Sequence, residues 1–372
     1  MTGVRVPFAG LGRAAAAIRA ELDAAIAGVL DSGWFVLGEQ VRAFEREFAA
    51  WCGAAHAVGV ASGTDAIEIA LRAAGIGRGD EVVTQANTCV PTVAAIARAG
   101  ATPVLCDVDP ATALIDPDSM ARAIGPRTRA VVPVHLYGQC ADLDAVASVA
   151  GDHGVMVIED CAQAHGAEHR GRHAGTVGAM GCFSFYPTKN LGALGDGGAV
   201  VTGDEGLAGR LRMLRQYGQT DRYHHAVPGI NSRLDELQAA VLRVRLAHLA
   251  DGNARRRSIA EAYTAELAGT GVAPLPELPE RHHAHHLYVV CTEERDRFQA
   301  AMERHGVATL IHYPIPIHRQ PGYRELADGP VGLGGSERLA ERVVSLPLYP
   351  ELSDEEARLV AEAAQAAASS VG

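Results

Sequence analysis

Short apolar segments rich in β-branched residues alternate with helical patterns between residues 55 and 202, and this alternation restricts the possible folds more than any other feature. Strands are predicted at 56–60, 81–84, 102–106, 130–135, 155–159, 182–185 and 199–202. Helices are predicted at 65–73, 91–99 and 143–152. This spacing is typical of an α/β sheet that is mostly parallel, covered on both faces by helices, and binds ligands at the carboxyl ends of its strands.

The second half of the chain has a different pattern. A long helix is predicted over 231–267, with a bend at Gly252, followed by a strand at 287–291, a helix at 295–305, a strand at 308–311 and a helix at 353–368. The sequence therefore predicts a large domain over 1–245, with an N-terminal helix, and a small α+β domain over 246–372.

Composition excludes several classes of function. The net charge is −11 and the longest basic run is three arginines at 255–257, so we expect no nucleic-acid or anionic-membrane partner. Neither a membrane span nor a signal peptide is predicted. Seven cysteines without CxxC spacing argue against a disulfide framework and a zinc knuckle. We expect a cytoplasmic protein.

The chain contains 33 basic residues, and only one of them, Lys189, is a lysine. Arginine can replace lysine in most surface roles, but it cannot supply a primary amine that condenses with carbonyls. Lys189 follows an aromatic strand and precedes a glycine-rich loop, where apolar surroundings would lower the pKa of its amine. These neighbours favour a chemical role over a chance surface position.

Three other groups lie at predicted strand ends. Gly63 and Thr64 begin a helix, whose N-terminal amides could bind a phosphate, as could the hydroxyl of Ser184. Asp160 follows a buried strand and needs a partner such as a protonated pyridine nitrogen. An amine, an acid for a ring nitrogen and a phosphate cradle are what pyridoxal 5′-phosphate (PLP) requires of a protein.

Four motifs together resemble the DegT/DnrJ/EryC1/StrS sugar aminotransferases. They are SGTDA at 62–66, EDCAQAHG at 159–166, FSFYPTKN at 183–190 and GINSRLDELQ at 229–238. The resemblance covers nearly the whole chain. It implies the aspartate-aminotransferase-like PLP fold (fold type I), with a seven-stranded sheet, and a homodimer whose active sites lie at the subunit interface.

The resemblance also implies roles for individual residues. Lys189 matches the Schiff-base lysine and Asp160 the partner of the pyridine nitrogen. Ala162 is implied to pack under the ring, and Gln163 to bind the ring hydroxyl. The implied phosphate contacts are Gly63, Thr64, Ser184 and, from the neighbouring subunit, Asn231. Family members often carry an aromatic residue stacked on the ring where this chain has Cys89, which leaves the stacking residue open.

The implied reaction is a transamination in two stages, with pyridoxamine phosphate between them and glutamate as the expected amino donor. The stretches GWFVLG at 33–38, YHH at 223–225 and IHYPIPIHRQ at 311–320 resemble members that aminate C3 of a nucleotide-linked, usually dTDP-linked, keto-deoxysugar. Trp34, His312 and Tyr313 are candidates for the sugar-nucleotide site. For Trp34 a place in the core fits equally well.

Arg233 could bind an incoming carboxylate, although an ion pair with Asp235 or Glu236 on a helix surface is favoured slightly. Three alternatives remain open for the function: amination of a cyclitol ketone, amination of a 4-keto sugar, or a non-catalytic regulator with the same fold. The histidine tract at 282–286 is interpreted as a solvated loop entering a strand, so no metal site is expected there.

Overall fold

A seven-stranded sheet forms the centre of the computed structural model, which describes residues 5–371. The strand order is β1-β9-β8-β5-β4-β2-β3. The strands are β1 (His56–Val60), β2 (Glu81–Gln85), β3 (Thr102–Cys106), β4 (Thr128–Val132), β5 (Met156–Asp160), β8 (Met180–Ser184) and β9 (Gly198–Thr202). Only β9 runs antiparallel to its neighbours, β8 and β1. The prediction of a large, mostly parallel sheet of seven strands is therefore confirmed.

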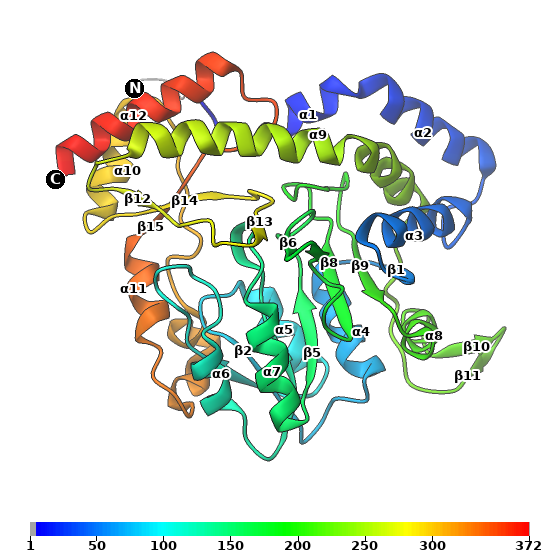
Figure 1. The fold of residues 1–372 in the computed structure, drawn as a ribbon. Helices are drawn as coiled ribbons and strands as arrows, with labels where there is room; N and C mark the ends of the chain where they lie inside the picture. The colour runs from blue at the N-terminus through cyan, green and yellow to red at the C-terminus, as the bar shows by residue number, and fades with distance from the viewer. Residues whose placement is uncertain (1–4, 372) are drawn as a thin grey trace.

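Helices cover both faces of this sheet (Figure 1). The helices α4 (Gly63–Ala73), α5 (Val90–Arg98) and α8 (Glu205–Leu214) pack on one face, in the same apolar cluster as Val82 of β2. The helices α6 (Pro117–Ala123) and α7 (Leu143–His153) pack on the other face, with Val83. Adjacent strand residues point to opposite faces, so a strand buried on both sides is apolar throughout.

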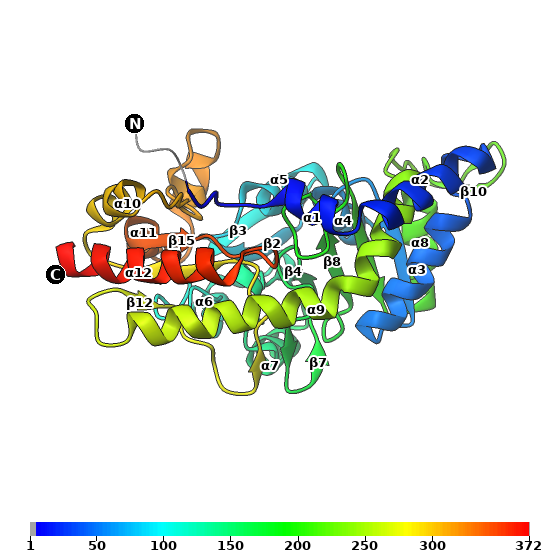
Figure 2. The same cartoon turned by 90° about the horizontal axis from the view of Figure 1, so that it is seen from above.

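One long helix, α9 (Glu236–Leu267), runs along the molecule beside α2 (Arg19–Ser32) and α3 (Glu39–Cys52), while the short α1 (Leu11–Ala17) precedes them (Figures 1 and 2). The helix begins at 236, so the predicted start at 231 is wrong. The Glu236 carboxylate accepts hydrogen bonds from the backbone N–H groups of Gly38, Gln40 and Val41, at 2.8–2.9 Å. These bonds cap α3, and Asp235 pairs with the extended Val36. At Gly252, where a bend was predicted, α9 continues without a break.

A second apolar core lies toward the C-terminal end of α9. It contains side chains of α9, α10 (Arg295–Arg304) and α12 (Asp354–Val371) and of two strands, β14 and β15, of the sheet β12-β14-β15. These strands are β12 (Ala273–Pro274), β14 (Tyr288–Cys291) and β15 (Val343–Leu346), and α11 (Gly334–Arg342) precedes β15. The predicted strand at 308–311 is wrong, because only Leu310 makes a bridge, to Ser345. The proposed boundary between 245 and 246 falls within α9.

Several short elements complete the fold. They are β6 (Glu168–His169), β7 (Arg172–His173) and β13 (Arg281–His282) in one small sheet, the hairpin β10 (Gln219–Asp221) and β11 (His224–His225), and 3₁₀ turns at Leu136–Gly138, Ile317–Arg319 and Pro321–Asp328. The hairpin projects from the body of the molecule (Figure 1). Within residues 5–371, no helix combines the length and apolar character needed to cross a bilayer.

Candidate active site

Lys189 lies on the wall of a cavity of about 650 Å³ between the sheet domain, the N-terminal segment and α9. Asn190, His286 and His312 share this wall. Lys189 is placed five residues after Ser184, the last residue of β8, while Asp160 is the last residue of the neighbouring β5. The parallel strands therefore bring the lysine loop and the acid to the same sheet edge, where the alternating pattern predicts ligand binding.

Hydrogen bonds fix the loop that carries Lys189. The Lys189 N–H donates to the Tyr186 carbonyl at 2.8 Å. The side-chain amide of the next residue, Asn190, donates to the Ala284 carbonyl at 2.8 Å and to Oδ1 of Asn253 at 2.9 Å. Burial lowers the pKa of the Lys189 amine, while the nearby Asp160 and Cys89 oppose this shift. The site therefore favours the neutral, nucleophilic amine more than bulk water does.

Asp160 is buried, and its two carboxylate oxygens each accept one hydrogen bond. Oδ2 accepts from Oγ1 of Thr92 at 2.8 Å, and Oδ1 accepts from the Ala162 N–H at 3.1 Å. Burial raises the pKa of this carboxyl although both hydrogen bonds and Lys189 oppose the shift. A carboxylate can accept about four hydrogen bonds, so this one retains capacity for a cationic partner from outside the chain.

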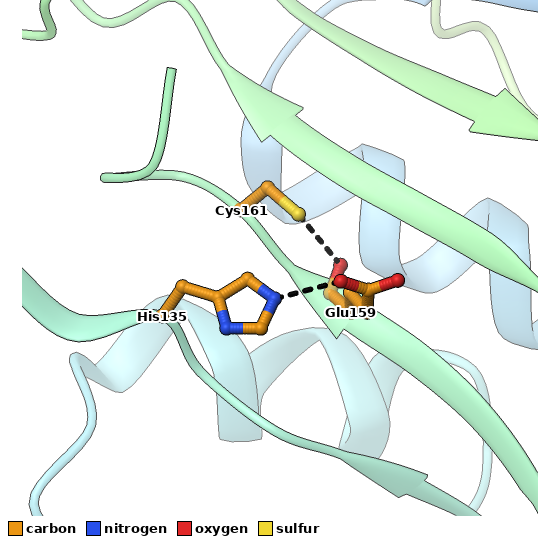
Figure 3. A group of neighbouring side chains, drawn as sticks. All are labelled: His135, Glu159 and Cys161. Atoms are coloured by element: carbon orange, nitrogen blue, oxygen red, sulfur yellow. Dashed lines mark hydrogen bonds and ion pairs between the residues drawn. The ribbon is translucent and has the colours of Figure 1, made fainter. Parts of the chain in front are cut away.

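Glu159, the acid that precedes Asp160, is held by hydrogen bonds within the protein (Figure 3). Its carboxylate accepts from His135 Nε2 at 2.8 Å and from the N–H groups of Gly175, Val177 and Gly178. Burial alone would raise the pKa of Glu159, but the bond from His135 and these amides hold it below its usual value. His135 Nδ1 accepts from the Ala141 N–H, so Nε2 carries the ring hydrogen.

Cys161 approaches this pair, and the three side chains are close enough together to suggest a metal site. However, both nitrogens of His135 and both oxygens of Glu159 already have hydrogen-bond partners in the protein. The Cys161 thiol lies 3.8 Å from the Glu159 carbonyl oxygen, and burial raises its pKa well above the usual value. The cluster is therefore a buried hydrogen-bonded network rather than a set of free metal ligands.

Gly63, Thr64 and Ser184 converge at the N-terminus of α4. A Cβ atom built on Gly63 would lie 2.5 Å from Cβ of Ser184, so glycine allows the two segments to meet. Ser62 caps the helix by accepting a hydrogen bond from the Asp65 N–H at 3.1 Å. Helix amides and a serine hydroxyl that meet at one point can bind a phosphate group.

Gln163, Tyr313 and Cys89 form a second group at this sheet edge. Oε1 of Gln163 accepts from the Tyr137 N–H at 2.6 Å, and its Nε2 donates to the Tyr313 hydroxyl at 3.2 Å. Burial raises the pKa of the Tyr313 hydroxyl well above its usual value, and the nearby Cys89 raises it further. Ala162 is partly buried beside Asp160.

The other predicted residues divide into two sets. His312 lines the cavity with Lys189, and its Nδ1 lies 2.8 Å from the Ser345 hydroxyl. Trp34, Asn231 and Arg233 do not line this cavity. Trp34 is 62% exposed, which excludes the alternative of a core aromatic. Asn231 is exposed too.

Within the described residues Arg233 makes no ion pair. Asp235 is extended and Glu236 is used in the cap of α3, so the favoured surface ion pair is wrong. The interpretation of the histidine tract also needs correction, because His285 and His286 are buried rather than solvated. His282, at the start of the tract, is exposed and lies in the short strand β13.

Sequence reasoning missed four residues that contact the site. Thr92 binds Asp160, Tyr137 binds Gln163, and Asn190 and His286 lie beside Lys189. Only Asn190 carried a local signal, because it directly follows the lone lysine. The other three reach the site from distant segments, and nothing in their neighbourhoods marks them.

Comparisons with known proteins identify the family to which the chain belongs. The model of the DegT/DnrJ/EryC1/StrS aminotransferase family matches residues 16–365. The chain is 49% identical to dTDP-3-amino-3,4,6-trideoxy-alpha-D-glucose transaminase of Streptomyces venezuelae, over 96% of this chain and 95% of the relative. It is 50% identical to the erythromycin biosynthesis sensory transduction protein EryC1 of Saccharopolyspora erythraea, over 95% and 96%. The crystal structure of S. venezuelae DesV in complex with a ketimine intermediate is similar with a TM-score of 0.95, at 49% identity and 98% coverage of both chains.

Proposed function

This chain belongs to the DegT/DnrJ/EryC1/StrS aminotransferase family, and from this membership we propose that it transfers an amino group from glutamate to C3 of a dTDP-linked keto-deoxysugar. The observation that carries the proposal is the lone lysine, partly buried on a cavity wall and electrostatically coupled to a buried aspartate. The similarity to a dTDP-3-amino sugar transaminase at 49% identity supports the choice of C3 and of the nucleotide.

The site fits PLP on two structural observations. The contact between Gly63 and Ser184 leaves no room for a side chain at the start of α4, where a phosphate would bind. The buried Asp160 has a raised pKa and, among residues 5–371, only two hydrogen-bond donors, as expected of an acid whose cationic partner is not part of the chain. When bound, PLP supplies an aldehyde that condenses with amines and a protonated ring that accepts electron density from the substrate.

In this proposal each residue has a defined task. The amine of Lys189 bonds the cofactor aldehyde and, once free, moves a proton at the reacting carbon. Asp160 would hold a proton on the ring nitrogen, because a buried carboxylate stabilises a nearby cation. Gln163 binds the ring hydroxyl, and Gly63, Thr64 and Ser184 bind the phosphate. Ala162 would pack under the ring, and Cys89 or a neighbouring residue would fill the space on its other face.

We also propose which residues bind the substrate in this reaction. His312 lines the cavity with Lys189 and Tyr313 accepts a hydrogen bond from Gln163, which supports the proposal that both contact the sugar. Trp34 and Asn231 are exposed, and we propose that they complete, with Arg233, the site of a neighbouring subunit in a homodimer. Such an interface needs exposed apolar surface, which the chain offers at Trp34, Phe35, Tyr217 and Tyr223. Seven free cysteines support a reducing, cytoplasmic location.

The test is a spectrum of the purified, PLP-loaded protein. Glutamate should remove the visible absorption of the lysine-bound cofactor, and a dTDP-3-keto-deoxysugar should restore it. A 4-keto sugar and a cyclitol ketone, tested in parallel, should restore it at least about tenfold more slowly. If a cyclitol ketone or a 4-keto sugar restores the absorption faster than the dTDP-3-keto-deoxysugar, the proposed substrate is wrong. If glutamate and other amino acids all leave the spectrum unchanged, the protein is a regulator rather than an aminotransferase.

A further inference from the structure

Arg256 of α9 carries a positive charge inside the protein without an acidic partner. Its side chain lies on the wall of the cavity that contains Lys189, and the residue is only 7% exposed. Among residues 5–371 it forms no ion pair, whereas its neighbours Arg255 and Arg257 each pair with an acidic side chain. Because a buried charge without a counter-ion is costly, this guanidinium is expected to bind an anion from outside the chain.

Only one of the three guanidinium nitrogens of Arg256 bonds the protein. Nη1 donates to the Leu348 carbonyl at 2.7 Å and makes longer bonds to the carbonyls of His285 and His286, at 3.3 and 3.4 Å. Within the described residues Nε and Nη2 have no acceptor, and neither nitrogen is fully covered by protein atoms. These two nitrogens form one edge of the planar group, and their N–H groups match the two oxygens of a carboxylate.

The other charges of the cavity do not neutralise Arg256. Burial lowers its pKa to about 10, so it stays charged at neutral pH. Arg245 lines the same cavity and, in the described part of the chain, has no ion pair either. Of the two acids on the wall, Asp251 is exposed, while Glu351 raises the pKa of both arginines without forming an ion pair with them.

His286 connects Arg256 to the lysine loop. Its carbonyl accepts from Nη1 of Arg256, and its ring Nδ1 lies 3.1 Å from Oδ1 of Asn190, the residue that follows Lys189. The positive charges of Lys189 and Arg256 both lower the pKa of His286, so both lie near its ring. The free edge of Arg256 and the amine of Lys189 therefore border the same part of the cavity.

We propose that Nε and Nη2 of Arg256 bind a carboxylate of the amino donor as a bidentate pair. The pair holds the donor in the cavity while its amino group reaches the cofactor at Lys189. A pyrophosphate, the other anion of the reaction, carries more than one charge and needs several donors, whereas one carboxylate satisfies this edge. The identity of the ligand rests on the proposed function, but the existence of a carboxylate site does not.

Glutarate tests the site without any reaction, because it has both carboxylates of glutamate but no amino group. Calorimetry measures its binding to the full-length, PLP-loaded protein, as wild type and as Arg256→Gln, whose amide can still donate to the Leu348 carbonyl. Loss of the charged, bidentate pair should raise the Kd for glutarate at least about tenfold. The Kd for dTDP, titrated in parallel, should stay within about twofold of wild type.

The matched control is Arg257→Gln, which makes the same charge change at the next position of α9. Arg257 pairs with Glu277 and does not line this cavity, so the variant should leave the Kd for glutarate unchanged. If wild type does not bind glutarate, or if folded Arg256→Gln binds it as tightly as wild type does, the proposal is wrong. A Kd that rises for dTDP instead of glutarate would also overturn it, because the arginine would then bind the phosphates of the nucleotide.

If Arg256→Gln does not fold, a crystal structure of the loaded wild type with glutarate decides. A carboxylate on Nε and Nη2 of Arg256 is expected there, and its absence would refute the proposal. Since glutarate binding involves no amino transfer, a positive result stands even if glutamate leaves the cofactor spectrum unchanged. In that case the proposed function fails and the carboxylate site remains.

Discussion

The hydroxyl of Thr92 donates a hydrogen bond to Oδ2 of Asp160 over 2.8 Å, and both side chains are buried. Thr92 Oγ1 lies in turn 2.7 Å from the hydroxyl of Thr88, so the acid is held by a short chain of hydroxyl groups. These bonds help the carboxylate to stay ionised where burial favours its protonation. Thr92 therefore positions Asp160 rather than taking part in the chemistry itself.

Two substitutions of Thr92 should separate the effect of its hydrogen bond from the effect of its packing. Thr92→Val keeps the shape of the side chain but leaves a buried carboxylate oxygen without its donor. We expect a loss of about 1–3 kcal/mol in the free energy of unfolding and about a tenfold fall in kcat. Thr92→Ser retains the hydroxyl and should stay within about threefold of wild-type kcat. Steady-state kinetics and chemical denaturation measure both effects, and equal kcat values for the two variants would contradict this role.

Lys189→Arg tests whether the lysine acts through its amine or through its charge. Arginine remains cationic but supplies no nucleophilic amine, so turnover should fall by at least about 10⁴-fold. Stopped-flow absorption after glutamate addition measures the first half-reaction directly. An unaltered rate would end the proposed chemistry. A thermal melt like that of wild type would show that the loss is not caused by unfolding.

The sheet was predictable because its signal is local. Each strand of a sheet covered on both faces needs a short apolar run, as at Val82 and Val83, and all seven central strands were located to within three residues. The lysine loop and the start of α4 were predictable for a similar reason, since each motif is contiguous in the sequence. Periodicity failed before Glu236, where extended backbone and a tertiary cap replace the first helical turn.

The partners of the site residues were not predictable in the same way. Thr92 is 68 positions from Asp160, and His286 is 96 positions from Asn190. A threonine near a helix start and a histidine in a polar tract have many ordinary roles. Only the fold brings them to the edge where β5 and β8 end.

Asp160→Asn should make the cofactor-free protein more stable and the loaded enzyme far less active. The folded-state pKa of Asp160 is raised, so protonation stabilises the fold at low pH and this contribution is lost as the pH rises through the folded-state pKa. At pH 7 the buried charge therefore lowers the stability of the cofactor-free protein, and asparagine removes this cost. Asparagine can still accept from the Ala162 N–H and donate to Thr92.

For this variant we expect a Tm a few degrees above wild type at pH 7 in the absence of cofactor, with the difference shrinking as the pH is lowered. We also expect turnover to fall by at least about 100-fold, because the ring nitrogen loses its ionic partner. Calorimetry between pH 4 and 8 and the glutamate half-reaction measure the two effects. A Tm difference that grows on acidification would contradict the sign of the pKa shift.

Gly63→Ala should weaken cofactor binding through a steric contact. The new Cβ would lie 2.5 Å from Cβ and 3.1 Å from Oγ of Ser184, so the serine must move away from the start of α4. Overpacking of this kind costs about 1–3 kcal/mol, and displacement of a phosphate ligand should raise the Kd for PLP about tenfold or more. Gly209→Ala, on the exposed face of α8 where a Cβ meets nothing within 4 Å, is the matched control and should leave the Kd unchanged. Because the two variants add the same methyl group to a helix, an equal Kd in both would show that the junction of α4 and β8 does not bind the phosphate. A rise in Kd confined to Gly63→Ala, with a fall in the Tm of the cofactor-free protein no larger than this overpacking explains, would place the phosphate there.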